Sequence, residues 1–118
     1  MRDHRKLRAF ELADEIAVLI YRATRRFPRE EVYNLTAQMR RAAVSVPSNI
    51  VEGCARETQA DYHRFLEIAF GSLRELHYQC DLAIRLEYLK PRGFEILEAK
   101  ISEAEKVLGA LLRSMRSS

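Results

Sequence analysis

Residues 58–89 of this 118-residue chain, TQADYHRFLEIAFGSLRELHYQCDLAIRLEYL, decide its fold. Apolar residues return at intervals of three and four, the period of an α-helix with one buried face. At about 1.5 Å per residue, this helix would be more than about 40 Å long. Gly71 in its middle costs up to about 1 kcal/mol relative to alanine, so we expect close packing there. The predicted buried face holds Tyr62, Phe65, Leu66, Ala69, Leu73, Leu76, Cys80, Ala83 and Ile84.

The same period predicts three further helices, over residues 6–24, 30–54 and 94–115. Phe27-Pro28, Gly53 and Pro91 supply the breaks between them. Pro47 falls inside the second helix, where it removes the hydrogen bond to the Ala43 carbonyl and predicts a kink. In the first helix, the predicted core face holds Ala9, Leu12, Ala13, Ile16, Leu19, Ile20 and Ala23.

Four amphipathic helices joined by short connections favour antiparallel neighbours. The predicted fold is therefore all-α, an up-down-up-down four-helix bundle that forms one domain over residues 1–118. No segment has the two-residue alternation of a strand, and no internal repeat is visible.

The net charge of +3 is unevenly distributed along the chain. Residues 1–56 hold 11 Lys and Arg against 7 Asp and Glu, whereas residues 57–118 hold 9 against 10. A basic first half suits a polyanion such as RNA or DNA, although a mildly basic solvated surface would look the same. No aromatic-interleaved basic patch is visible, so sequence-specific base recognition is not indicated. The candidate nucleic-acid contacts are Arg22, Arg25, Arg26, Arg29 and Arg40.

We expect the protein to lie in the cytoplasm. No apolar run approaches the roughly 20 residues of a membrane span, and the first ten residues lack the apolar core of a signal peptide. Cys54 and Cys80 should be reduced there, and they are expected to be packing thiols.

Two helices carry a second apolar stripe that a monomeric bundle would leave in water. Such stripes predict self-association, although scattered exposed apolar residues are also common. The stripe of the first helix holds Phe10, Ala17 and Tyr21, and that of the second holds Ala37, Val44 and Val51.

A polar ladder follows the second helix between its core face and solvent. It consists of Gln38, Arg41, Ser45, Asn49, Glu52 and Arg56, with Ser72, Glu75 and Gln79 of the third helix expected to face it. One interpretation is a hydrogen-bond network that sets helix register or subunit docking, in which Arg41 pairs with Glu52 or Glu75. The other is a polar pocket or a groove that contacts nucleotides.

Catalytic and metal chemistry find no support in the sequence. The three histidines lack the Glu-x-x-His pattern of a di-iron bundle, and no glycine-rich phosphate loop occurs. His63 with Glu67 and His77 with Asp81 have the spacing of surface ion pairs. We therefore expect no catalytic site, no metal, no cofactor and no small-molecule substrate.

Two stretches, QMRRAAVSVPSNIVEGCAR at 38–56 and FLEIAFGSLREL at 65–76, follow Tyr21 and Phe27-Pro28. In this order they resemble the four-helix-bundle proteins encoded within 23S ribosomal RNA intervening sequences, over nearly the whole chain. Val46, Val51 and Phe10 depart from the family pattern, which often has Ile, Ala and Trp there. The matching positions are Phe27, Pro28, Gln38, Arg40, Arg41, Ser45, Asn49, Glu52, Gly53, Arg56, Gly71, Ser72 and Glu75.

The resemblance implies a homo-oligomer, a five-membered ring, without enzymatic activity. It also implies kinship with the accessory protein of diversity-generating retroelements, a similar bundle thought to bind nucleic acid. The residues and the resemblance together leave three hypotheses. The protein is an oligomer that binds nucleic acid through backbone charge, a protein–protein scaffold, or an enzyme that uses the polar ladder.

Overall fold

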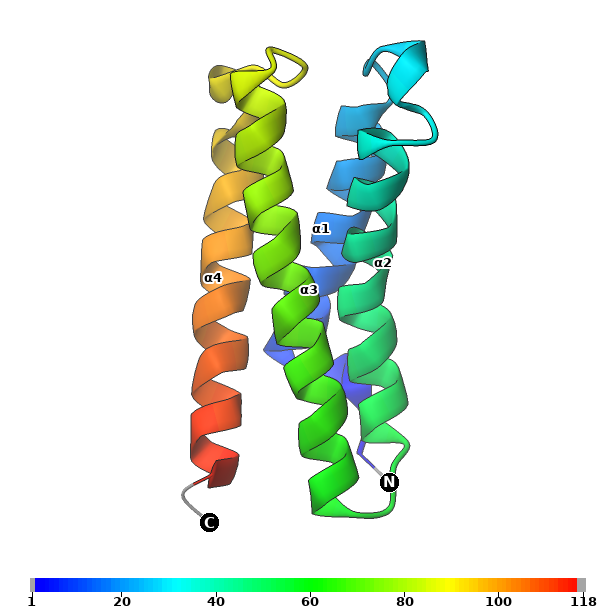
Figure 1. Cartoon of the computed structure of the whole chain (residues 1–118). Helices are drawn as coiled ribbons and strands as arrows, with labels where there is room; N and C mark the ends of the chain where they lie inside the picture. Colours follow the sequence, from blue (N-terminus) through cyan, green and yellow to red (C-terminus); the bar gives the residue numbers. More distant parts are fainter. Residues whose placement is uncertain (1, 117–118) are drawn as a thin grey trace.

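A computed structural model describes residues 2–116 and contains four α-helices (Figure 1). Within these residues there is no strand, which confirms the all-α prediction. The helices are α1 (Arg8–Thr24), α2 (Leu35–Cys54), α3 (Gln59–Arg85) and α4 (Pro91–Arg116), with short 3-10 turns η1 (His4–Lys6) and η2 (Arg29–Glu31) before α1 and α2.

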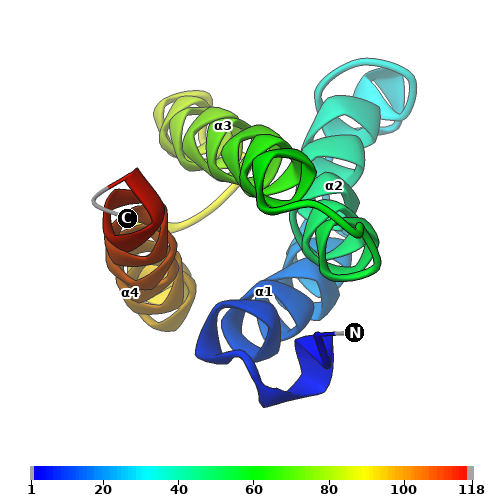
Figure 2. The same cartoon turned by 90° about the horizontal axis from the view of Figure 1, so that it is seen from below.

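The helices follow one another around the bundle in chain order, and each runs antiparallel to the next (Figures 1 and 2). α4 returns to pack against α1, while within the described residues no Cα atom of α1 lies within 8 Å of one in α3, and the same holds for α2 and α4. The closest pairing is α2 with α3. The up-down-up-down four-helix bundle predicted from the sequence is therefore confirmed, with extents of 45 × 24 × 20 Å.

The core consists of the predicted stripes, whose large side chains meet along the bundle axis. Burying each such side chain contributes about 1.5–3 kcal/mol to folding. Four residues that the periodicity also assigned to the core are only partly buried, namely Leu19, Ala23, Phe65 and Ile84. The largest fully buried side chains include Leu12, Ile16, Ile20, Met39, Val46, Ile50, Leu66, Leu73, Leu76, Ile101 and Leu108.

The connection between α3 and α4 differs from the prediction. The periodicity carries the third helix to Leu89, but the helix ends at Arg85 because Glu87 takes a left-handed backbone conformation with φ of 65°. The carbonyl of Ala83 accepts hydrogen bonds from the N–H groups of Tyr88 and Leu89, which closes the turn. Pro91 then begins α4, since the first helical position needs no N–H donor.

The start of α2 also differs from the prediction, because residues 29–31 form η2 and the helix proper begins at Leu35. α2 then continues through Pro47 to Cys54 without interruption. A bend at Pro47 stays a prediction. α3 begins where the Thr58 hydroxyl accepts a hydrogen bond of 3.1 Å from the N–H of Asp61.

The close helix approach lies at Gly53, and the expectation of close packing at Gly71 is wrong. A Cβ atom added at Gly71 would meet nothing within 4 Å, whereas one at Gly53 would lie 2.9 Å from the Cβ of Phe65. Gly53 therefore allows α2 to approach α3 near the end of the pair.

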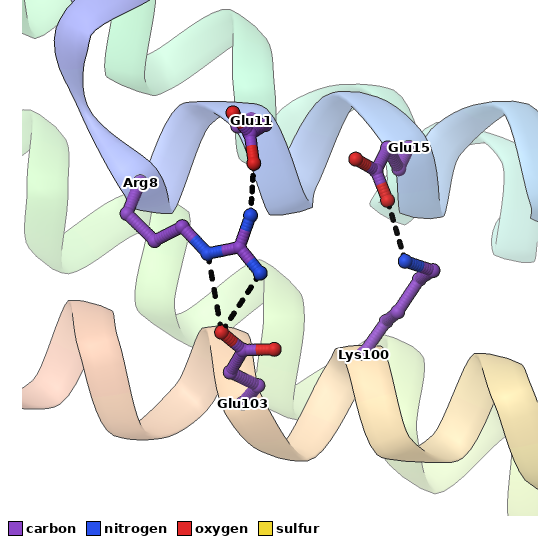
Figure 3. Close-up of polar contacts among 5 residues, drawn as sticks. All are labelled: Arg8, Glu11, Glu15, Lys100 and Glu103. Carbon is purple, nitrogen blue, oxygen red and sulfur yellow. Dashed lines mark hydrogen bonds and ion pairs between the residues drawn. The ribbon is translucent and has the colours of Figure 1, made fainter.

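Ion pairs connect α1 to α4 along the contact between these two helices, here called the α1–α4 seam (Figure 3). Lys100 Nζ of α4 donates to Glu15 Oε2 of α1 at 2.6 Å. Arg8 of α1 lies between Glu11 on its own helix and Glu103 on α4, with a hydrogen bond of 2.9 Å to Glu103 Oε2. The hydrogen bond from Lys100 lowers the pKa of the Glu15 carboxyl.

Candidate nucleic-acid interface

One end of the bundle carries four exposed arginines of the predicted nucleic-acid set. Arg22 lies in the last turn of α1, and Arg25, Arg26 and Arg29 follow in the connection to α2. Cations suit the C-terminal end of a helix because the helix dipole is negative there. None of the four makes an ion pair within residues 2–116, so their guanidinium groups face solvent.

The antiparallel fold brings the α3–α4 connection to the same end (Figure 1). Residues 22–41 and 81–95, which form this end, hold nine Lys and Arg against five Asp and Glu. The rest of the chain holds eleven against twelve. The surplus positive charge of the protein therefore lies at one end of the bundle. Comparing sequence halves missed Lys90 and Arg92, which belong to the acidic second half yet stand at the basic end.

The fifth predicted contact, Arg40, is turned inward. Its Nε donates to the Thr24 hydroxyl at 2.9 Å, and its Nη2 donates to the Tyr21 carbonyl at 3.3 Å. The guanidinium also stands 4.7 Å from the centre of the Tyr21 ring. Arg40 therefore links α2 to the end of α1, where it donates to the Tyr21 carbonyl together with the Thr24 hydroxyl.

Hollows lined by arginine flank this basic end. A hollow of about 410 Å³ between α1 and α4 has Arg22 and Arg26 at its edge, with Leu89 and Ile96 beside them. A second hollow of about 350 Å³ is lined by Tyr21, Arg22 and Arg25 among others. Both hollows are shallow and open, which suits a chain lying across the surface better than an enclosed small molecule.

The polar ladder lies along the α2–α3 contact. The Ser45 and Ser72 hydroxyls share a hydrogen bond of 2.8 Å, and Asn49 Nδ2 donates to the Ser45 hydroxyl at 3.0 Å and to its carbonyl at 2.8 Å. Farther along α3, Gln79 Nε2 donates to Glu75 Oε2 at 3.3 Å. The Ser45–Ser72 bond joins the two helices, whereas the other bonds connect adjacent turns of a single helix.

Arg41 does not form the predicted ion pairs. Glu52 lies eleven residues farther along the same helix, about 16 Å away, and pairs instead with Arg56 at 3.4 Å. Arg41 and Glu75 line one open hollow of about 310 Å³ but form no ion pair within the described residues. Gln38, Ser45 and Ser72 also line it, so this part of the predicted ladder shares one surface, whereas Asn49, Glu52, Arg56 and Gln79 do not line the hollow.

The two stripes assigned to self-association differ in exposure. Phe10 and Ala17 pack against the core, and the Phe10 ring meets the His4 ring edge-on at 4.7 Å. Ala37 is also partly buried. The remaining members stand in solvent, with exposed fractions of 42% for Tyr21, 41% for Val44 and 37% for Val51. The α2 stripe is thus the more open of the two.

His63 and His77 each form an ion pair with a glutamate. His63 pairs with Glu67 at 3.4 Å, as the spacing of the two residues predicts. His77 reaches Glu105 of α4 at 3.0 Å, so its predicted pairing with Asp81 is wrong. Within residues 2–116 no group of three or more His, Cys, Asp or Glu side chains is placed to hold a metal ion.

Cys54 and Cys80 are buried, free thiols. Burial raises the pKa of both, that of Cys80 to about 12, and a thiol that stays protonated is a poor nucleophile. Among residues 2–116, no helix has the length and apolar character needed to cross a membrane.

These features define a class: a small antiparallel four-helix bundle with a basic end. The chain belongs to the family described as 23S rRNA-intervening sequence protein, whose model matches residues 5–110. No curated protein matches the chain.

A solved structure supports the same assignment. It is the crystal structure of a protein of unknown function from the S23 ribosomal protein family of Bacteroides thetaiotaomicron VPI-5482. The two chains are 25% identical with a TM-score of 0.81, over 89% of this chain and 95% of the other. The family resemblance seen in the sequence is confirmed, and neither comparison indicates an enzymatic family.

Proposed function

We propose that this protein acts in the cytoplasm as a non-enzymatic homo-oligomer whose basic end binds nucleic acid through the phosphate backbone. The observation that carries the proposal is the gathering of Arg22, Arg25, Arg26 and Arg29, exposed and without ion pairs in the described structure, at one end. Free guanidinium groups pair readily with phosphate oxygens, and such contacts require no particular base sequence.

Assembly would multiply this charge. In a ring of five subunits, the size that the family resemblance implies, the basic ends would repeat around one rim. Several weak contacts on one polyanion then act together, because each bound subunit raises the effective concentration of the next. The exposed valines Val44 and Val51 on α2 are the apolar surface that we assign to the subunit contact.

Fluorescence anisotropy with labelled RNA and DNA at increasing salt tests the binding. We expect binding at low salt that weakens steeply as salt rises. The variant Arg25→Gln/Arg26→Gln/Arg29→Gln should bind at least about tenfold more weakly. Its salt slope should be shallower by about 0.9 for each duplex phosphate that the variant no longer neutralises.

A matched control removes three positive charges from other parts of the surface, as Lys6→Gln/Arg64→Gln/Lys106→Gln. The two variants have the same net charge, so only the location of the removed charge differs. Equal weakening in both variants would contradict a basic end, and no binding by the wild-type oligomer at low salt would refute the proposed function.

A second candidate is a protein scaffold, favoured by the exposed Val44 and Val51 stripe if it recruits a different protein. Sedimentation velocity separates the cases. We expect an oligomer that Val44→Asp/Val51→Asp dissociates and that Ile96→Asp, on the non-adjacent helix α4, leaves intact. A wild-type monomer would favour the scaffold.

A further inference from the structure

Tyr33 stands at the basic end with an exposed fraction of 92%, higher than that of any other large hydrophobic residue in the described chain. It lies in the connection between η2 and α2. A tyrosine ring can bury a large flat area against a partner at little cost in conformational entropy, because it has few rotatable bonds. Its display on an arginine-rich surface therefore suggests a flat binding partner.

The connection that carries Tyr33 is anchored. The Tyr88 hydroxyl donates to Glu31 Oε2 at 2.9 Å, and the Phe27 and Tyr88 rings pack with centroids 5.5 Å apart. These contacts hold η2 against the α3–α4 connection. The Tyr33 ring is thus presented from a fixed turn, and binding a partner would not have to order this segment first.

Three exposed arginines lie near this turn in the chain. Arg25, Arg26 and Arg29 precede Tyr33 within eight residues, all exposed. Glu30 and Glu31 lie between these arginines and Tyr33, and Glu31 accepts a hydrogen bond from the Tyr88 hydroxyl. The surface combines free cations with a free aromatic ring, the combination by which proteins bind single-stranded nucleic acid.

We propose that Tyr33 stacks on an unpaired base and so gives the basic end a preference for single-stranded nucleic acid. This inference rests on the proposed function. The arginines hold the phosphates of any strand, but in a duplex each base is already stacked between its neighbours. Only an unpaired base offers its face to the ring, and stacking of this kind tolerates every base.

The test compares a labelled single strand of about 20 nucleotides, long enough to span one binding site, with the duplex of the same sequence. For the single strand, Tyr33→Ala should weaken binding by about 5- to 150-fold, the range that removing one stacked base produces. For the duplex, the same variant should stay within about twofold of wild type. Tyr33→Phe, which keeps the ring, should bind both substrates as wild type does.

Tyr78, 58% exposed on α3, offers the matched control, and Tyr78→Ala should leave both affinities unchanged. If Tyr33→Ala weakens neither substrate, or weakens both equally, the stacking role is refuted while backbone binding stands. If wild-type protein binds neither substrate at low salt, the proposed function fails together with this inference. The stacking role is supported if Tyr33→Ala, and neither Tyr33→Phe nor Tyr78→Ala, weakens binding of the single strand while leaving binding of the duplex unchanged.

Discussion

Gly53 marks a close approach of α2 to α3, and replacing it with alanine tests how the bundle is packed. The new Cβ would lie 2.9 Å from Phe65 Cβ and 3.4 Å from the carbonyl oxygen of Tyr62. Neither neighbour can rotate away, because one is fixed to the backbone and the other belongs to it. The helices must therefore shift apart along the most closely packed pair of the bundle.

The expected cost follows from two opposing effects. Overpacking a well-packed contact costs about 1–3 kcal/mol, whereas alanine gains up to about 1 kcal/mol over glycine in a helix. Gly53 is the second-last residue of α2, where the helix gain is reduced. We therefore expect Gly53→Ala to lower the free energy of unfolding by about 1–2 kcal/mol.

Gly71→Ala is the matched control, since the chemical change is identical and the surroundings are open. Gly71 is exposed in the middle of α3, and a Cβ there meets nothing within 4 Å. The substitution should raise the free energy of unfolding by about 0.5–1 kcal/mol through helix propensity alone. The two variants should thus differ from wild type in opposite directions.

Urea unfolding followed by far-ultraviolet circular dichroism measures both variants. Running it at several protein concentrations separates subunit stability from self-association. The reasoning would be refuted if Gly53→Ala were as stable as wild type, or if Gly71→Ala were destabilised as much as Gly53→Ala.

Further predictions concern the thiols and the α1–α4 seam. Cys54 and Cys80 are buried and have raised pKa values, so neither should react with Ellman's reagent at mildly alkaline pH in the folded protein. Both should react in urea. Rapid reaction in the folded protein would show that the core opens. The hydrogen bond from Lys100 lowers the pKa of Glu15 in the folded protein. The Glu15–Lys100 ion pair therefore contributes fully to stability above the ordinary glutamate pKa, and this contribution is lost as the pH falls through the lower pKa of the folded state. Thermal melts of Glu15→Gln should accordingly fall below wild type at neutral pH and converge with it in strong acid; a constant difference at all pH values would contradict the ion pair.

Several features of the fold and candidate site could be predicted because they depend on local sequence. A period of three and four places Leu66, Leu73 and Leu76 on one side of a helix wherever that helix packs. The same period grouped Ser45 with Asn49, one turn apart on α2. Arg22 and Arg25 lie in the last turn of α1 and in the connection that follows it, and both are exposed.

Other features could be settled only by the tertiary structure, because they depend on a second segment. Arg40 turns inward because α1 ends beside it, with the Thr24 hydroxyl and the Tyr21 carbonyl as acceptors. Lys90 joins the basic end because antiparallel packing carries the α3–α4 connection there (Figure 1). Periodicity determines which side of each helix faces the core, but not how near the neighbouring helix comes. That distance, set by packing across the bundle, is why a Cβ atom at Gly53 would collide with Phe65 and one at Gly71 would meet nothing within 4 Å.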